Sequence, residues 1–503
     1  MLLLALACWR DDAVDTGTVP DPTTDTALGC VADPLPASLT NASLQQRWGS
    51  FQWEARDGVV QTAWTYMPTS WDGESVLFVI HGSSRNVDRY LLAFAPVGER
   101  NGALVVAPHF TEEDYPSTED WTLGVGLDGT PYGEGFHEGE WRDPNDYTLS
   151  EIEHVYEALR TELSLPSCRY DIVGHSAGSQ FVHRLAVFRP DARFNQAIAA
   201  NSGWYTLPST LDSMPYGLDG SPMDGDKQRA AMVRRPVTLL LGQLDTETPE
   251  EDSALRDTEQ ANAQGRNRLQ RGRYALGVAT KEANALDVAL GWRSVEVPGA
   301  GHDKDEMSQS AGLLLAGVEP CEPSETVELQ LNEILADPPD DLPGDANGDG
   351  TRDPYDDEFI ELVNTGSSSV CLQGWRVEES HLGRTHVFPV GTVLEPGKAL
   401  VVFGDGVPTG SFGGSSVQWA AHTNELDLQN SGDVLRVVSP DEVEALAFSW
   451  GDCGDGVCAE DHYDGELNIN QSLVRDTEGT WKPHGFVSSA LFSPGTRSDG
   501  EAW

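Results

Sequence analysis

The stretch YDIVGHSAGSQFVHRLAVF (residues 170–188) places a serine between two glycines, in the order Gly174, Ser176 and Gly178. The residues before the serine are apolar, as in a buried strand, and an amphipathic run with helical spacing follows it. Between a strand and a helix, the glycines permit a tight turn that lifts the serine hydroxyl above the sheet. The stretch therefore predicts an α/β fold with Ser176 as a nucleophile; an ordinary turn serine is the alternative.

The surrounding region, residues 50–320, alternates short apolar runs with helical patterns, which is typical of a mostly parallel sheet flanked by helices. Apolar spacing predicts a helix over 149–163, and FQWEARDGVVQTAWTYMP (51–68) predicts an antiparallel hairpin. The expected strands of the parallel sheet lie at 75–80, 103–108, 170–175, 196–201, 236–242 and 292–299.

A serine hydroxyl is a poor nucleophile and needs a base that is oriented by an acid. In folds of this kind the acid and the histidine follow later strands, in that order. Asp245 comes after the apolar run PVTLLLG, and His302 comes after WRSVEVPG. We predict these two as the acid and the base, with Asp303 or Asp305 as alternative acids.

An oxyanion hole needs backbone amides aimed at the developing negative charge. The amide of Ala177 directly follows the nucleophile, and the amide of Ser83 lies in the loop HGSSRN after an earlier strand. Trp204 and Tyr205 follow the strand after the nucleophile, where they are expected to form a substrate-binding wall or, alternatively, to be core aromatics.

On these motifs, residues 50–320 resemble an α/β-hydrolase, and within it the polyhydroxybutyrate-depolymerase-like bacterial esterases. The stretches that carry the resemblance are IHGSSRNVDRY, GHSAGSQFVHR, NSGWYTLP, LLGQLDTETP, AQGRNRLQRG and VPGAGHD. The resemblance implies a serine esterase without a catalytic cofactor, acting on small or polymeric esters.

From about residue 327 the pattern changes to strand-like runs broken by Gly, Pro, Asn and Asp, which predicts an all-β sandwich. Residues 327–450 resemble the lamin-tail domain, an immunoglobulin-like sandwich. The resemblance implies an accessory module for attachment to a surface or a substrate.

The composition excludes one class of partner. The chain of 503 residues has 32 Lys and Arg against 81 Asp and Glu, a formal net charge of −49. Such a surface repels phosphate backbones, so nucleic-acid binding is not expected. The start MLLLALACWRDD resembles a lipoprotein lipobox with Cys8 as the lipidated residue; a short apolar leader with an incidental cysteine is the alternative. We expect an exported protein, anchored to the membrane or cell surface by lipid or secreted.

The cysteines other than Cys8 are even in number, which indicates disulfides in an oxidising compartment. We predict a local bridge between Cys453 and Cys458, because only a short glycine-rich loop separates them. The helix after His302 is expected to run back towards the start of the nucleophile strand. This predicts Cys168–Cys321 and, by default, Cys30–Cys371.

The acidic stretch GDANGDGTRDPYDDEF (344–359) is similar to the first half of a calcium loop. Its alternating oxygens and a glycine turn predict a structural calcium site, with a solvated acidic turn as the alternative. The predicted ligands are Asp345, Asn347, Asp349, Thr351 and Asp356.

The sequence thus predicts an exported serine esterase that cleaves carboxylic esters and carries an accessory β-sandwich. A serine peptidase on the same fold and a surface-adhesion protein with an inactive hydrolase half are the alternatives. The predicted divisions are a signal segment (1–7), a disordered tether (8–29), a hydrolase domain (30–321), a linker (322–326) and the lamin-tail-like domain (327–503).

Overall fold

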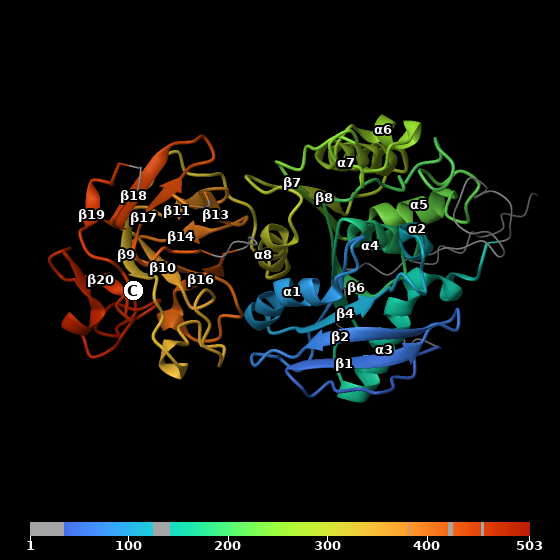
Figure 1. The fold of residues 1–503 in the computed structure, drawn as a ribbon. Helices are drawn as coiled ribbons and strands as arrows, with labels where there is room; N and C mark the ends of the chain where they lie inside the picture. The colour runs from blue at the N-terminus through green and yellow to red at the C-terminus, as the bar shows by residue number, and fades with distance from the viewer. Residues whose placement is uncertain (1–34, 124–140, 382, 421–425, 454–456) are drawn as a thin grey trace, which may run out of the picture. The chain divides into compact units, whose positions relative to one another are not determined.

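The computed structural model describes residues 35–123, 141–381, 383–420, 426–453 and 457–503 (Figure 1). The predicted signal segment, tether and lipidation site at Cys8 lie outside these residues, as does Cys30. None of the helices in the described part of the chain is long and apolar enough to span a membrane.

The first domain is built on an eight-stranded sheet in the order β1-β2-β4-β3-β5-β6-β7-β8. From β4 to β8 every pairing is parallel, whereas β1 and β2 form the predicted antiparallel hairpin at one edge. The central strands are buried on both faces, which explains their uninterrupted apolar sequences. The strands are β1 (Trp48–Glu54), β2 (Val60–Tyr66), β3 (Val76–Ile80), β4 (Leu104–His109), β5 (Tyr170–His175), β6 (Phe194–Ala200), β7 (Val237–Gly242) and β8 (Trp292–Val297).

Helices cover both faces of this sheet (Figure 1). Alternate residues of β3 show the division: Leu77 and Val79 pack with α1 and α8, whereas Phe78 and Ile80 pack with α3 and α4. The fold is therefore an α/β-hydrolase, as predicted. The helices are α1 (Val87–Asn101), α2 (Thr118–Thr122), α3 (Glu151–Leu163), α4 (Ala177–Phe188), α5 (Asp226–Val233), α6 (Glu259–Gln264), α7 (Arg268–Ala285) and α8 (Lys304–Leu315).

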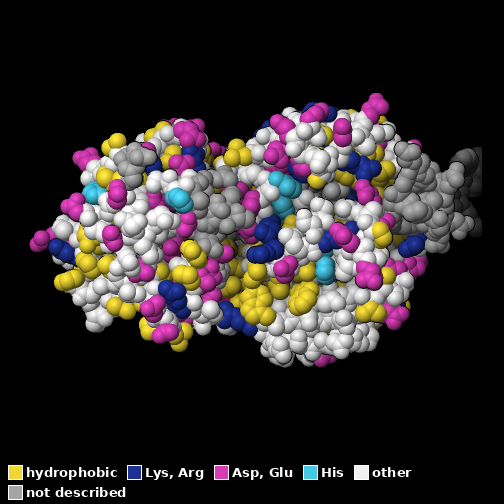
Figure 2. Space-filling view, viewed as in Figure 1, with side chains coloured by type: hydrophobic (Ala, Val, Ile, Leu, Met, Phe, Trp, Pro, Cys, Tyr) yellow, Lys and Arg dark blue, Asp and Glu magenta, His cyan; other side chains and the backbone are white. Residues whose placement is uncertain are grey.

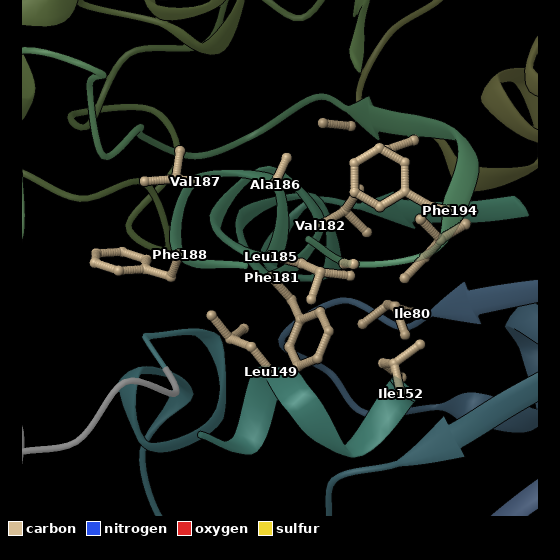
Figure 3. Close-up of a cluster of buried hydrophobic side chains, with 14 of the residues drawn as sticks. Ile80, Leu149, Ile152, Phe181, Val182, Leu185, Ala186, Val187, Phe188 and Phe194 are labelled. Carbon is tan, nitrogen blue, oxygen red and sulfur yellow. The ribbon is translucent and has the colours of Figure 1, made fainter. Parts of the chain in front are cut away.

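Helix α4, which begins directly after Ser176, is buried along its whole length. Figure 3 shows Phe181 and Leu185 of this helix pointing towards Leu149, Ile152 and Ile80 from neighbouring elements. A helix that is buried all round needs an apolar environment on every face. This packing fixes the start of the helix, and with it the position of the nucleophile.

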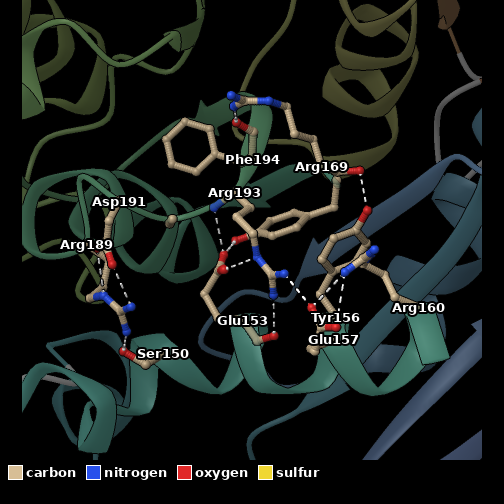
Figure 4. Close-up of polar contacts among 12 residues, drawn as sticks. Ser150, Glu153, Tyr156, Glu157, Arg160, Arg169, Arg189, Asp191, Arg193 and Phe194 are labelled. Atoms are coloured by element: carbon tan, nitrogen blue, oxygen red, sulfur yellow. Dashed lines mark hydrogen bonds and ion pairs between the residues drawn. The ribbon is translucent and has the colours of Figure 1, made fainter. Parts of the chain in front are cut away.

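Charged side chains hold α3 against the sheet. Glu153 accepts hydrogen bonds from the backbone amide and the guanidinium of Arg193, which lies just before β6, and from the hydroxyl of Tyr170 on β5 (Figure 4). Arg193 also contacts Glu157 one turn further along the same helix. Removing Arg193 would leave the buried carboxylate of Glu153 without its cationic partner, whereas Glu157 would keep its ion pair with Arg160.

The second domain is β-rich. A six-stranded sheet has the order β16-β15-β10-β9-β20-β21, a five-stranded sheet has the order β13-β12-β17-β18-β19, and β11 pairs with β14. Apolar side chains from both larger sheets form one core, which includes Trp375 and Trp450. The strands are β9 (Leu329–Leu335), β10 (Phe359–Asn364), β11 (Val370–Cys371), β12 (Arg376–Glu379), β13 (Gly383–Val387), β14 (Val393–Leu394), β15 (Ala399–Phe403), β16 (Ser416–Trp419), β17 (Gly432–Val438), β18 (Glu444–Gly451), β19 (Asp461–Tyr463), β20 (Leu473–Arg475) and β21 (Trp481–Pro483).

The disulfides correct two of the predicted pairs and confirm a third. Cys453 bonds to Cys458, as predicted. Cys321 bonds to Cys371 and not to Cys168, so the predicted pairs Cys168–Cys321 and Cys30–Cys371 are both wrong. After α8 the chain leaves the sheet and runs beside β11, where the amide of Ser324 donates to the carbonyl of Cys371 (3.0 Å). Cys168 is also disulfide-bonded, to a different residue.

Candidate active site

The structure brings Ser176, His302 and Asp245 together at the carboxyl ends of the parallel strands. His302 Nε2 lies 3.1 Å from Ser176 Oγ, and His302 Nδ1 lies 2.7 Å from Asp245 Oδ2. Asp245 is almost fully buried, whereas the His302 side chain remains 26% exposed and open to solvent. A carboxylate that is hydrogen-bonded to an imidazole, which in turn is hydrogen-bonded to a hydroxyl, is the arrangement needed to activate a serine.

Ser176 stands on a strained turn between β5 and α4. Its φ of +56° and ψ of −117° lie outside the regions that ordinary residues adopt. A Cβ on Gly178 would lie 2.0 Å from the carbonyl oxygen of Ile80, and one on Gly174 would lie 2.2 Å from that of Gly178. Both glycines are therefore required by close backbone approach, which gives the motif its physical basis.

The alternative acids have other roles. Asp303 caps the start of α8, where its carboxylate accepts hydrogen bonds from the amides of Asp305 and Glu306. Asp305 pairs with Lys304. Of the three carboxylates that the sequence offered, Asp245 is the one that contacts His302.

Asn201, which directly follows β6, joins two of the loops that carry the site. Its side chain donates to the carbonyl of Gly301 (2.9 Å), next to His302, and accepts from the amide of Gly242 (2.8 Å), in the loop that leads to Asp245. The preceding carbonyl, of Ala200, accepts from the amide of Ser176. Sequence reasoning missed Asn201, because only the assembled strands place it between these loops.

The predicted oxyanion donors, the amides of Ala177 and Ser83, belong to the start of α4 and to the loop after β3. Ala177 is the first residue of α4, so its amide has no acceptor within the helix. Ser83 is exposed in the loop after β3, and within the described residues no protein acceptor is recorded for either amide. The neighbouring Gly82 is close to the nucleophile, since a Cβ there would lie 3.5 Å from that of Ser176. The strand order reverses between β3 and β5, which is where ligands bind in open α/β sheets.

Two further histidines, His81 and His175, lie beside the site. His81 Nδ1 donates to the carbonyl of Gly82 (2.8 Å), and its Nε2 accepts from the amide of Phe110 (3.0 Å). Burial lowers the pKa of His81 to about 3, so the ring is neutral. The ring of His175 contacts that of His302 in a tilted arrangement with centroids 4.7 Å apart, and burial lowers the pKa of His175 well below the ordinary value. The hydroxyl of Tyr90 lies 3.0 Å from His175 Nδ1.

Trp204 and Tyr205 are packed inside the protein. Trp204 is 3% exposed, and its ring centroid lies 4.2 Å from the guanidinium carbon of Arg184 and 4.7 Å from that of Arg256. Tyr205 is fully buried beside His183. These contacts agree with the alternative of core aromatics, and a substrate contact by either ring stays a prediction.

The predicted calcium loop forms a series of turns. Asp345 accepts from the amide of Gly350 (2.9 Å), Asn347 from that of Asp349 (3.0 Å), and Asp349 from that of Thr351 (2.8 Å). In the described residues, the group of three potential ligands found close together is Cys453, Cys458 and His462, whose cysteines are already bonded to each other. Calcium binding by the loop, Asp356 included, therefore stays a prediction.

Comparison with solved structures identifies the first domain. Poly(aspartic acid) hydrolase-1 from Sphingomonas sp. KT-1 is 32% identical, with a TM-score of 0.50, over 54% of this chain and 98% of that one. The poly(3-hydroxybutyrate) depolymerase LpqC from Bordetella parapertussis is 30% identical, with a TM-score of 0.50, over 55% of this chain and 91% of that one. The chain belongs to the α/β-hydrolase family of these two enzymes. This confirms the predicted resemblance to polyhydroxybutyrate-depolymerase-like proteins.

The second domain is also identified. Residues 322–452 match the lamin tail domain, in agreement with the resemblance stated from the sequence. Among curated proteins, no match to the chain was found. The chain thus carries a lamin tail domain after its α/β domain.

Proposed function

We propose that this hydrolase cleaves carboxylic esters through an acyl-enzyme on Ser176. The observation that carries the proposal is the hydrogen-bonded position of His302 between Ser176 (3.1 Å) and Asp245 (2.7 Å). Because the hydrogen bonds among Ser176, His302 and Asp245 are all present, an adhesion protein with an inactive hydrolase half is disfavoured.

In the first half-reaction, Ser176 Oγ attacks the ester carbonyl and its proton passes to His302 Nε2. Asp245 accepts the hydrogen bond from Nδ1 and stabilises the positively charged ring. The amides of Ala177 and Ser83 donate to the oxyanion, and the tetrahedral intermediate collapses when His302 protonates the departing alkoxide. Water then attacks the acyl-enzyme by the same route, which releases the carboxylic acid and restores Ser176.

The proposed substrates are uncharged esters, either small or polymeric, such as a polyhydroxyalkanoate. Two observations support this choice: the relationship to a poly(3-hydroxybutyrate) depolymerase, and a net charge of −49 that repels polyanions. Hydrolysis of amide bonds is the second candidate, because a poly(aspartic acid) hydrolase is 32% identical. A panel of p-nitrophenyl esters, aminoacyl anilides and poly(aspartic acid) separates the two, since an esterase acts on the first set alone.

We also propose that the protein works outside the cytoplasm, with the lamin tail domain attaching it to a surface or a polymer. The Cys321–Cys371 and Cys453–Cys458 disulfides support an oxidising compartment. Lipidation of Cys8 would be one means of attachment.

Labelling with a fluorophosphonate probe tests the nucleophile. The wild type should be labelled, and Ser176→Ala should lose labelling completely, because the probe bonds to the activated serine oxygen. Ser179→Ala is the matched control on the same helix, where the Ser179 hydroxyl contacts Ser202, and it should remain labelled. Equal labelling of the wild type and Ser176→Ala would contradict the assignment.

A further inference from the structure

A buried arginine contacts the acid of the triad. Arg268, the first residue of α7, is only 4% exposed, and its Nη1 lies 3.3 Å from Asp245 Oδ1. The other carboxylate oxygen, Oδ2, is the one that contacts His302. Through Nη2, the same guanidinium also pairs with Asp252, whose side chain is 20% exposed. Arg268 thus lies between two carboxylates, one of which belongs to the triad.

The start of α7 is fixed to the loop that carries Asp245. The side-chain amide of Asn267 donates to the carbonyl of Thr246 (3.3 Å), and the amide of Leu269 donates to the carbonyl of Asp245 (3.4 Å). Asn267 also caps the helix by accepting from the amide of Gln270. The arginine therefore reaches the triad from a fixed backbone position.

We propose that Arg268 and Asp252 form a positioning pair that orients Asp245 and tunes how strongly Asp245 favours the protonated ring of His302. The inference rests on the proposed function of the triad. It assigns a role to Arg268 in the stretch AQGRNRLQRG (263–272). That stretch carries part of the family resemblance, but the sequence alone assigns no role to any of its residues.

Three charged groups near His302 come from other elements: Asp245, Arg268 and Asp252. Asp252 interacts electrostatically with His302, and although burial raises its pKa, hydrogen bonds from Arg268 and Ala254 hold that pKa below the ordinary value. The ring of His175, which is tilted against that of His302, is neutral, since burial and then the nearby charges of His302, Arg268 and Lys304 lower its pKa. The charged residues that directly follow His302 in its own loop and helix are Asp303, Lys304, Asp305 and Glu306.

These charges act in opposite directions on the base. A positive guanidinium beside Asp245 disfavours a second positive charge on His302, whereas the carboxylate of Asp252 favours it. When Arg268 and Asp252 are paired, their opposite effects on the protonation of His302 nearly cancel. Arg268 can therefore hold Asp245 in place without suppressing the protonated state of His302 that the reaction requires. Removing either member leaves the charge of the other uncompensated.

The test measures the second-order rate of fluorophosphonate labelling against pH, which needs no knowledge of the natural substrate. The rate depends on a neutral His302, so its acidic limb reports protonation of the base. In Arg268→Met we expect this limb to move to higher pH by roughly half a unit to one unit, with a slower plateau rate. In Asp252→Asn we expect it to move to lower pH, and Arg268→Lys should restore much of the wild-type profile.

Arg273→Met is the matched control. Arg273 lies on α7 like Arg268, but it pairs with Glu296 of β8 and its side chain is exposed. Its profile should not move. A shift of the limb in the same direction in Arg268→Met and Asp252→Asn, or no shift in either, would overturn the inference while leaving Ser176 as the nucleophile. If Arg268→Met fails to fold, the direction of the shift in Asp252→Asn decides alone. If the wild type shows no labelling that depends on Ser176, the proposed function is overturned, and this inference with it.

Discussion

Ser176 and Asn201 are both held in left-handed backbone conformations that non-glycine residues seldom adopt, with φ of +56° and +51°. Each follows directly on a strand of the parallel sheet, and each occupies the point where the chain must turn sharply. Such local strain persists only where surrounding contacts impose it. In this hydrolase those contacts are the hydrogen bonds that join the ends of β5, β6 and β7 to the loop of His302.

Asn201→Ala should lower kcat by about 10-fold to 100-fold with little change in KM for a small ester. The substitution removes the side-chain hydrogen bonds to Gly242 and Gly301, so the backbone bond from the amide of Leu244 to the carbonyl of Ala300 (2.8 Å) is left to hold the acid and base loops together. Steady-state kinetics on a p-nitrophenyl ester would measure the effect. Asn195→Ala, on the same strand but exposed, is the control and should behave as the wild type. An unchanged kcat in Asn201→Ala would mean that the loops hold themselves.

Residues that act through a local motif could be predicted from the sequence, whereas residues that act through assembled loops could not. Ser176 is marked by its glycines, and Asp245 and His302 by their order after apolar strands. Asn201 and Arg268 lie in stretches that carry the family resemblance, but the sequence assigns neither a role, because their partners are brought near only by the packing of separate strands and helices.

At the scale of elements, two glutamates face each other inside the lamin tail domain. Glu361 of β10 pairs in register with Glu333 of β9, and both side chains are fully buried. Glu361 accepts hydrogen bonds from Asn332 (2.8 Å) and from the amide of Gly495 (2.7 Å), whereas Glu333 accepts from Ser472 and Ser493. Burial, and then the charge of Glu333, raises the pKa of Glu361 to about 8.

This pair predicts that the lamin tail domain loses stability as the pH rises. A carboxyl whose pKa is raised by folding binds its proton more tightly in the native state. Its contribution is complete below the ordinary carboxyl pKa and is lost as the pH approaches 8, by up to about 1.4 kcal/mol per pH unit. Thermal unfolding between about pH 5 and about pH 8 should show a falling midpoint, and Glu361→Gln, which cannot ionise, should flatten it.

Glu328→Gln, an exposed change just before β9, is the control for this measurement and should keep the wild-type slope. If Glu361→Gln and the wild type lose stability equally between these pH values, the ionisation of Glu361 does not limit the stability of the domain.

Elements with strong periodicity were predicted correctly, such as the hairpin of β1 and β2 and the helix α3. The contacts between elements that are distant in sequence were not predicted correctly. The prediction for Cys321 assumed that the chain after α8 stays with the first sheet, but it crosses to β11 and bonds to Cys371. The pairing of β20 with β9 was likewise not predicted, because a strand as short as β20 carries no periodic signal.

The charge of the whole molecule bears on which substrates can approach it. Acidic side chains are spread over the visible face of both domains in Figure 2, in keeping with 81 Asp and Glu against 32 Lys and Arg. At low ionic strength such a surface lowers the local concentration of anions and slows their association. Salt shortens the range of this repulsion, from about 20 Å at about 20 mM to about 4 Å at about 500 mM.

The hydrolase should therefore discriminate between esters by charge in a manner that depends on salt. Raising NaCl over this range should increase kcat/KM for an anionic ester, such as a p-nitrophenyl hemisuccinate, by about 3-fold to 10-fold, chiefly through KM. A neutral p-nitrophenyl ester of similar chain length is the control and should change by less than about 2-fold, because no long-range force acts on it. A choline ester, which is cationic, should respond in the opposite direction.

If the anionic and neutral esters respond alike, the net charge of −49 does not act at the mouth of the active site. The argument that favours neutral polyesters over poly(aspartic acid) would then lose its electrostatic support.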